Sequence, residues 1–278
     1  TQTPLDKAET AGAAFAAKVG CASQTAACLR GLPVSIIQAN DVMGLTGYTP
    51  GVVDGEVLKQ SIGTAFASGQ FNRVPMINGT NHDEARLFAA VSELQGAPIT
   101  AANYQAAIAS TLGVSANAAA VIATQYPLSA YPSPALAFSA VGTDAIFACP
   151  ALTLDQLASK FVPTFAYEFS DASAPQRFLP PVSFPYGAAH ASEIQYLFDL
   201  PTAAIPVTFT PQQQRLATSM KDYWADFAER GFPSSRGQPR WPRFYSRSQQ
   251  MLSLVPPRPQ VQKGFAAEHH CAFWAHAG

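Results

Sequence analysis

Hydrophobic and polar positions along the chain change from helical spacing to strand spacing and back. Residues 5–19 are Ala-rich and are followed by Gly20, which predicts a helix with a glycine stop. Residues 74–78 form a short apolar run closed by Gly79, typical of a buried strand. Residues 162–169 alternate and are rich in aromatic side chains, as strands are. Strands that alternate with helices predict an α/β architecture.

The clearest predicted helix covers residues 211–230. Thr210 suits the N-cap, Pro211 the first helical position, and Gln213 completes a capping box. Gly231 supplies the stop. Steps of three and four residues align one apolar stripe, which indicates core packing rather than a ligand site: Leu216, Met220, Tyr223, Trp224 and Phe227.

The rest of the chain divides less sharply. Helices are predicted over 101–124 and over 135–160, the latter interrupted around Pro150. A helix is expected to start within 83–90, which places Glu84 near a strand-to-helix turn. The remaining expectations are loops with brief strands over 43–63, a proline-rich break over 126–134, a loop over 171–189, an apolar stretch over 194–198 and a last strand over 251–255.

Composition limits the function classes. The 278 residues include 17 Lys or Arg and 18 Asp or Glu, a net charge of −1 that argues against a nucleic-acid binder. No unbroken apolar run approaches the length of a membrane span, and the residues from Thr1 onward do not form a basic-then-apolar signal segment. Because the chain begins at Thr1 without an initiator Met, we expect a processed or truncated start.

The four cysteines leave the redox state open. They are Cys21, Cys28, Cys149 and Cys271, without a C-x-x-C pair, which disfavours a zinc ribbon or a thioredoxin-like motif. Four cysteines allow three pairings, and a Cys21–Cys28 bridge would leave Cys149 with Cys271. Four buried thiols in a cytosolic protein are the alternative, whereas two disulfides would imply an oxidising compartment.

Two residues are candidates for chemistry. Glu84 alone would most often be a solvated residue favoured by a helix dipole, and His190 alone would most often be structural. The tandem pair His269 and His270 lacks an H-E-x-x-H context, and His190 with Glu193 lacks further ligands, so no metal site is predicted. Phosphate-binding glycine motifs are absent as well.

Several segments in order resemble the type B carboxylesterase family of α/β-hydrolases, which includes cholinesterases, para-nitrobenzyl esterases and fungal lipases. VPMINGTNHDEARLF (74–88) resembles the segment that carries its acidic triad residue, and GAAHASEIQYLF (187–198) its histidine segment. Further matches are listed in chain order: VGCASQTAACLRGLP, GVVDGEVL, FACPALTLDQLA, YWADFAERGFP followed by WPRF, and HHCAFW.

The resemblance implies an α/β-hydrolase fold in which residues 1–278 form the C-terminal portion of one domain: part of the central mixed sheet plus an Ala-rich helical region. It implies the disulfides Cys21–Cys28 and Cys149–Cys271, and with them a secreted or periplasmic protein. It also implies a small ester substrate and no metal or organic cofactor. Phe184 and Tyr186, just before the histidine, are expected to line the substrate pocket.

By the same resemblance, His190 takes a proton from a serine nucleophile and Glu84 orients the imidazole. The chain order of such triads is serine, acid, histidine, which places the serine before Glu84. No G-x-S-x-G occurs there; the nearest run, at 113–117, lacks the second glycine and is more typical of a helix end. The Gly-rich oxyanion segment is also absent.

We therefore expect the nucleophile and oxyanion donors on an N-terminal portion that is cleaved or separate. A lone later portion would expose an apolar face and a sheet edge, so its partner would be that N-terminal portion or a second copy over the exposed face. The alternatives to an ester hydrolase are a binding or adhesion homologue that has lost catalysis and an inactive fragment.

Overall fold

The computed structural model describes residues 2–40 and 51–276, which divide into two compact units, Thr1–Phe71 and Asn72–Gly278. In the first unit, the strands β1 and β2 form a parallel pair. Residues 41–50, where loops with brief strands are expected, lie outside the described residues. The elements of this unit are β1 (Thr3–Pro4), α1 (Leu5–Lys18), α2 (Ala26–Arg30), α3 (Val34–Asn40), β2 (Val52–Val53) and α4 (Ile62–Ser68).

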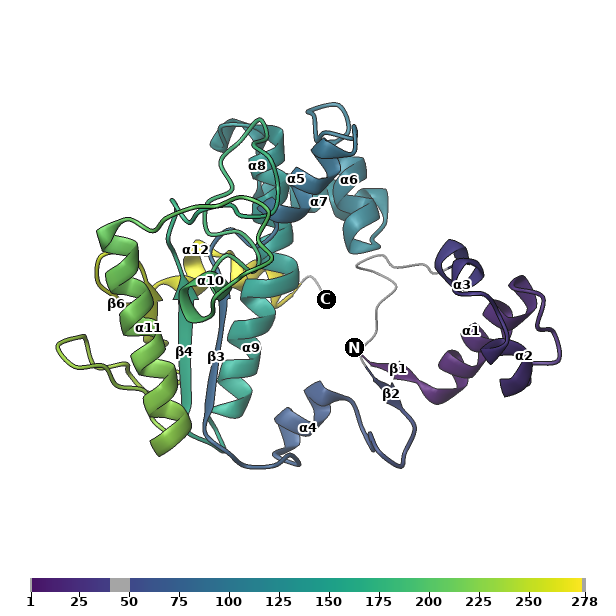
Figure 1. Cartoon of the computed structure of the whole chain (residues 1–278), viewed down its shortest axis with the longest axis horizontal. Coiled ribbons are helices and arrows are strands. Elements are labelled where there is room, and N and C mark those ends of the chain that lie inside the picture. The colour runs from purple at the N-terminus through teal and green to yellow at the C-terminus, as the bar shows by residue number, and fades with distance from the viewer. Residues whose placement is uncertain (1, 41–50, 277–278) are drawn as a thin grey trace. The chain divides into compact units, whose positions relative to one another are not determined.

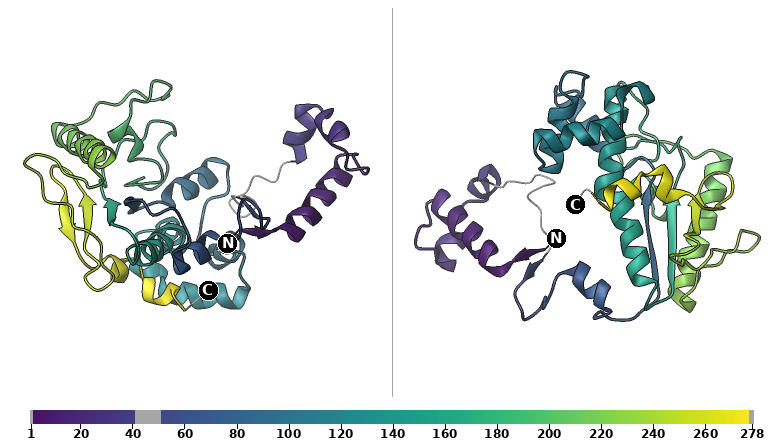
Figure 2. Two further views of the ribbon diagram at one scale, coloured as in Figure 1. Left: turned by 90° about the horizontal axis from the view of Figure 1, so that it is seen from below. Right: turned by 180° about the vertical axis from the view of Figure 1, so that it is seen from behind.

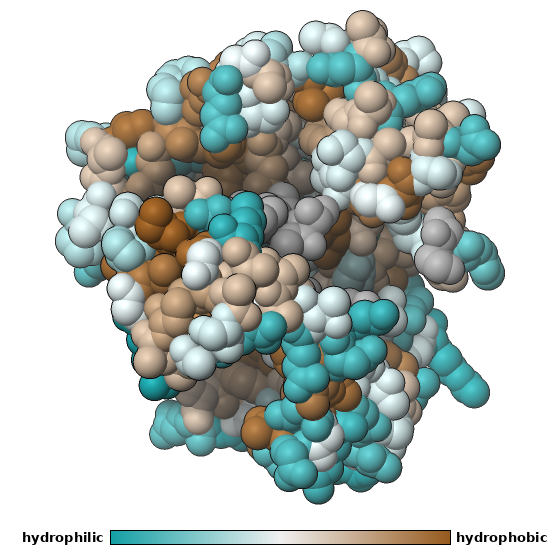
Figure 3. All heavy atoms as spheres, turned by 90° about the vertical axis from the view of Figure 1, so that its right-hand side faces the viewer, coloured by the Kyte–Doolittle hydropathy of each residue, from teal (hydrophilic) through white to brown (hydrophobic). Residues whose placement is uncertain are grey.

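The helix expected over 5–19 is α1, and Gly20 follows it with a φ of +83°. A disulfide between Cys21 and Cys28 closes the next loop, with the Cα atoms 5.8 Å apart. Large apolar side chains on this unit are exposed, Val34 and Val57 most of all. Figure 3 shows such hydrophobic side chains interspersed with hydrophilic ones on one face of the molecule.

The second unit contains a four-stranded sheet in the order β3-β4-β5-β6 (Figure 1). Helices connect β3 to β4 and β4 to β5 and follow β6, whereas a short turn joins β5 to β6. Strands β3 to β5 are parallel, and β6 runs antiparallel to β5. This mixed, largely parallel sheet with helices is part of an α/β-hydrolase fold, which confirms the predicted fold class. The strands are β3 (Met76–Asn81), β4 (Thr164–Phe169), β5 (Met251–Leu254) and β6 (Gln260–Gln262).

The helices of this unit include α11, which spans exactly the predicted 211–230 and has the predicted capping box. A short 3-10 helix, η1, and a π-helix, η2, lie among these helices. The ranges are α5 (Arg86–Leu94), α6 (Tyr104–Leu112), α7 (Ala116–Gln125), η1 (Leu128–Ala130), α8 (Pro134–Gly142), η2 (Thr143–Ala148), α9 (Cys149–Ala158), α10 (Ile194–Leu197), α11 (Pro211–Arg230), α12 (Phe265–Glu268) and α13 (Cys271–Trp274).

The central strand β4 faces a different layer with each alternate residue. Phe165 and Phe169 pack with Leu216 and Met220 of α11. Ala166, which points the other way, packs with the side that includes α9 and the C-terminal helices. Because successive strand residues point to opposite faces, the sheet is covered on both sides, as Figure 2 also shows.

A separate apolar cluster lies among helices α5 to α8, around buried Tyr104, Ile108 and Phe138. The helix expected to break near Pro150 instead continues from Pro134 to Ala158 through the π-helical turn η2. Pro150 is tolerated because it lies in the first turn of α9, just after the hydrogen-bonding pattern has changed. Although polar residues interrupt its sequence, this helix is long and on average apolar enough to cross a membrane. Most of its apolar part is buried inside the protein.

One ionic cluster joins η2, β4 and the C-terminal segment. Buried His269 hydrogen-bonds Asp144 through Nδ1 at 2.6 Å and Glu168 through Nε2 at 2.7 Å. The disulfide between Cys149 and Cys271 lies two residues beyond His269, with the Cα atoms 5.2 Å apart. Burial alone would lower the pKa of His269, but the two carboxylates outweigh burial and raise it to about 9.

We expect this cluster to make stability pH-dependent. Because the folded-state pKa of His269 lies above its unfolded value of 6.5, its contribution is complete below pH 6.5 and is lost as the pH rises through about 9. That contribution is about 3 kcal/mol of unfolding free energy. Urea unfolding of His269→Gln between pH 6 and 9 should show lower stability and a flatter pH profile.

The neighbouring substitution His270→Gln is the matched control. The His270 ring bonds the exposed amide of Gln125 and meets Tyr126 edge-on, and among the described residues it makes no hydrogen bond to Asp144 or Glu168. It should retain the wild-type pH profile. If His269→Gln retains that profile too, His269 is not a charged member of the cluster.

Candidate functional site

Glu84 lies in the turn between β3 and α5. Its Oε1 accepts hydrogen bonds from the Asn81 amide at 2.8 Å and from the Thr80 hydroxyl at 3.0 Å. Both donors belong to the end of β3, so the strand itself orients the carboxylate. Glu84 is buried, and this arrangement leaves Oε2 to point away from the strand toward another partner.

That partner is His190. The distance from Glu84 Oε2 to His190 Nδ1 is 2.6 Å, and the His190 amide also donates to the Glu84 carbonyl at 3.2 Å. The structure therefore brings together the two residues predicted from sequence, which are 106 positions apart. With Nδ1 facing a carboxylate, a neutral imidazole carries its proton on Nδ1 and leaves a lone pair on Nε2, the form of a general base.

The loop that carries His190 is fastened to the Glu84 turn. The backbone N–H of Asp83 donates to the Ala188 carbonyl at 3.0 Å, and Asp83 Oδ2 accepts from the backbone N–H of Ala188 at 2.9 Å. Gly187, at a φ of +63°, permits this approach, because a Cβ there would lie 2.2 Å from Asp83 Oδ2. Asn81 adds a hydrogen bond from its Nδ2 to the Ala189 carbonyl at 2.8 Å. The 171–189 loop is thus held in one position where it meets the sheet.

The π-helical turn η2 supports the same turn from another side. The hydroxyl of Thr143 accepts a hydrogen bond from the Ala85 amide at 3.0 Å. Gly142 allows this contact, because a Cβ there would come within 2.8 Å of the Ala85 side chain. Phe147 of η2 lies 5.3 Å from the His190 ring, centroid to centroid. The π-helix therefore contacts both the turn that carries Glu84 and the ring of His190.

The surroundings of His190 raise the affinity of its imidazole for a proton. The hydrogen bond that His190 donates to Glu84 raises the pKa of His190; partial burial opposes this, and the charges of Glu84 and Glu193 add to it. Burial raises the pKa of Glu193 itself, although a hydrogen bond from Asn81 counteracts part of that rise. The His190 side chain remains 43% exposed, so its Nε2 can be reached from outside.

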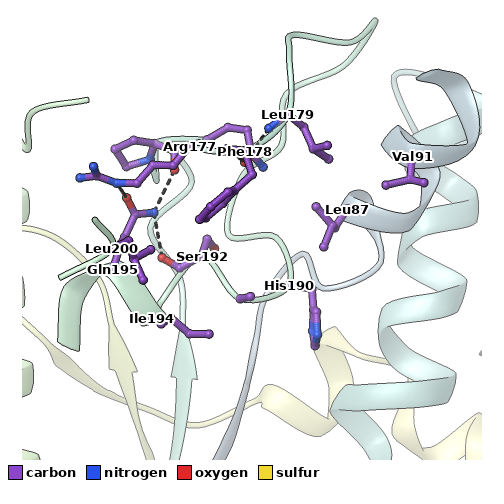
Figure 4. Close-up of a pocket in the computed structure, with 13 residues that line it drawn as sticks. Leu87, Val91, Arg177, Phe178, Leu179, His190, Ser192, Ile194, Gln195 and Leu200 are labelled. Atoms are coloured by element: carbon purple, nitrogen blue, oxygen red, sulfur yellow. Dashed lines mark hydrogen bonds between the residues drawn. The ribbon is translucent and has the colours of Figure 1, made fainter. Parts of the chain in front are cut away.

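An apolar cavity of about 450 Å³ adjoins His190 (Figure 4). Leu87 and Val91 of α5 form one side, and Phe178 with Leu179 from the 171–189 loop lies across from them. Gln195 at the far end is fixed by hydrogen bonds to the Pro175 and Ser192 carbonyls. The cavity can hold an apolar group next to His190.

Phe184 and Tyr186 do not line this cavity. Phe184 is buried in the helical cluster of α5 to α8, and Tyr186 packs against the same cluster and donates its hydroxyl to the Pro180 carbonyl. The loop crosses the apolar helices before it turns at Gly187, and an irregular loop has no periodicity from which its inward residues can be predicted. Phe178 and Leu179, earlier in the loop, reach the cavity instead.

The remaining sequence candidates have structural roles. Ser115, in the run that most resembles a nucleophile motif, caps α7 by accepting from the Ala118 amide at 3.2 Å. His269 belongs to the ionic cluster, and His270 bonds Gln125. Among residues 2–40 and 51–276, no cluster of His, Cys, Asp and Glu could hold a metal ion. Sequence reasoning missed Thr80 and Asn81, although polar residues at the end of a buried strand are a recognisable signal.

We expect Glu84→Gln to lower the pKa of His190, because the substitution removes the carboxylate that raises it. The imidazole C–H resonances of His190, followed by NMR as a function of pH, measure this directly. Glu229→Gln, which changes an exposed carboxylate on α11, should leave the titration of His190 unchanged. An unchanged pKa in Glu84→Gln would show that the two side chains do not interact.

Comparison with known proteins agrees with this geometry. The sequence profile described as "Carboxylesterase family" matches residues 2–274. The chain is 30% identical over 227 residues to acylcarnitine hydrolase of Mus musculus, which covers 77% of this chain and 39% of that protein. It is 27% identical over 239 residues to cocaine esterase of Homo sapiens, covering 82% of this chain and 41% of that protein.

The pyrethroid hydrolase Ces2e of Rattus norvegicus is 29% identical over 202 residues, 69% of this chain and 35% of that protein. The chain thus spans about two fifths of the length of the curated relatives it matches. With a family match over nearly every residue and the acid and histidine segments side by side, the chain belongs to the carboxylesterase family.

Proposed function

We propose that this chain supplies the acid and the base of a Ser-Glu-His triad in a carboxylic ester hydrolase. The observation that carries the proposal is the 2.6 Å contact between Glu84 Oε2 and His190 Nδ1. A carboxylate at Nδ1 fixes the tautomer that has a basic Nε2 and stabilises the imidazolium once the base has taken a proton. Glu84 is itself fixed by Asn81 and Thr80, so little reorganisation is needed during the reaction.

In this mechanism, His190 Nε2 removes the proton from a serine hydroxyl as the oxygen attacks the ester carbonyl carbon. The protonated imidazole then gives that proton to the leaving alcohol, and an acyl-serine remains. A second cycle with water in place of serine releases the carboxylic acid. Glu84 stays ionised throughout and balances the transient positive charge on the ring.

We further propose that the nucleophile and the oxyanion donors lie on polypeptide outside these 278 residues. Two observations support this: the sequence contains no G-x-S-x-G, and no described residue hydrogen-bonds His190 Nε2. The natural partner is the N-terminal portion of the same hydrolase domain, in one longer chain or as a cleaved piece. A second copy over the exposed face is the alternative occupant of that surface.

The proposed substrate is a small ester, whose apolar part would occupy the cavity beside His190. The relatives acylcarnitine hydrolase and cocaine esterase have names consistent with this class. The proposed location is secreted or periplasmic, because both disulfides, Cys21–Cys28 and Cys149–Cys271, persist in an oxidising compartment.

The test is hydrolysis of a short-chain aryl ester by the longer protein, or by this chain co-expressed with its N-terminal portion. His190→Ala should lower kcat/KM by roughly a thousandfold or more, since the serine–base unit then fails as a whole. His270→Ala serves as the control and should retain wild-type activity. Wild-type activity in His190→Ala would remove His190 from the mechanism, and an inactive wild type would favour a binding homologue or an inactive fragment.

A further inference from the structure

The segment between α11 and α12 has an unusual charge. Residues 231–264 contain six Lys or Arg residues and no Asp or Glu, whereas the rest of the chain has 11 basic and 18 acidic residues. All six are exposed, and none pairs with a carboxylate among the described residues. We call them the basic edge: Arg236, Arg240, Arg243, Arg247, Arg258 and Lys263.

Buried anchors hold this segment against the sheet. Trp241 donates its indole N–H to the Ala166 carbonyl at 2.9 Å, and the Phe244 amide donates to the Thr164 carbonyl at 2.7 Å. Both anchor side chains are buried, whereas their neighbours Arg240, Arg243 and Tyr245 point outward. The loop therefore presents its basic residues from a fixed backbone.

The turn between β5 and β6 lies beside the loop that carries the other basic residues. Arg258 donates from Nη2 to the Gly237 carbonyl at 3.3 Å, which links the β5–β6 turn to the loop that follows α11. Lys263 directly follows β6, the edge strand of the sheet opposite β3. Figures 1 and 2 show this loop and β6 together on that side of the second unit.

Exposed apolar residues lie among these charges. Phe232 is 48% exposed, Tyr245 54% and Val261 43%. The guanidinium of Arg243 lies over the Tyr245 ring at 5.6 Å, so a cation and an aromatic ring are held side by side at the surface. The nearby acids are Asp222, Asp226, Glu229 and Glu268; Asp226 pairs with Arg230, Ser235 bonds Asp222, and Glu268 bonds His82.

We propose that the basic edge docks the protein on an anionic lipid surface. Basic residues accumulate at negatively charged headgroups, and aromatic and aliphatic side chains between them enter the interfacial region. The rest of the chain carries more acidic than basic residues, so it repels a long polyanion that would wrap around the protein. The same repulsion turns the basic edge toward a flat negative surface. No membrane-spanning segment is involved in this contact.

Sedimentation with vesicles tests the proposal. The protein should bind vesicles of phosphatidylcholine with 30% phosphatidylglycerol and not those of phosphatidylcholine alone, and binding should weaken as salt rises from 0.05 to 0.5 M. Arg243→Gln with Arg247→Gln should weaken binding by roughly tenfold or more. The control pair Arg215→Gln and Lys221→Gln removes the same charge from the exposed face of α11 and should have a much smaller effect.

Tyr245→Ser tests the apolar contribution without a change in charge. It should weaken vesicle binding and leave its salt dependence unchanged. The proposal is overturned if anionic vesicles are not bound, if the two charge pairs weaken binding equally, or if the protein is retained on heparin but does not sediment with vesicles. The last result would identify an acidic polymer as the ligand of the basic edge.

Discussion

The hydrogen bond between Glu84 and His190 is the constraint on which the rest of the site depends. An irregular loop carries the histidine, and a loop without further contacts would not hold an imidazole within 2.6 Å of a carboxylate. The end of β3 fixes the carboxylate through the Asn81 amide and the Thr80 hydroxyl, and Asp83 fastens the loop to the same turn. The end of the sheet thus sets the position of the His190 ring.

The supports of this pair extend through the second unit. The π-helix η2 contacts the Glu84 turn through Thr143 and the ionic cluster through Asp144. His269 connects Asp144 to Glu168 of β4, and the Cys149–Cys271 disulfide closes the same region covalently. Removing the charge of one buried member would leave its partners unpaired, which is why such clusters are costly to disturb. Stability and the geometry of the site therefore depend on shared residues.

Sequence reasoning recovered the elements whose signals are local. The capping box at Thr210 and the glycine that follows the helix located α11 to the residue. The ordered family motifs singled out Glu84 and His190, which the structure places in contact. The direction of side chains in the 171–189 loop could not be predicted, because an irregular loop has no periodicity. The burial of Phe184 in the helical cluster is an example. The π-helical continuation past Pro150 and the pairing of His269 with two carboxylates depend on contacts between distant segments, which local patterns do not encode.

The central claim is that His190 serves a serine supplied from outside these 278 residues. Labelling the longer, active protein with a fluorophosphonate and mapping the modified peptide by mass spectrometry tests it most directly. The account predicts a single labelled serine before the segment described here, with labelling abolished in His190→Ala. A label on a serine within these residues, such as Ser192 beside the histidine, would contradict it.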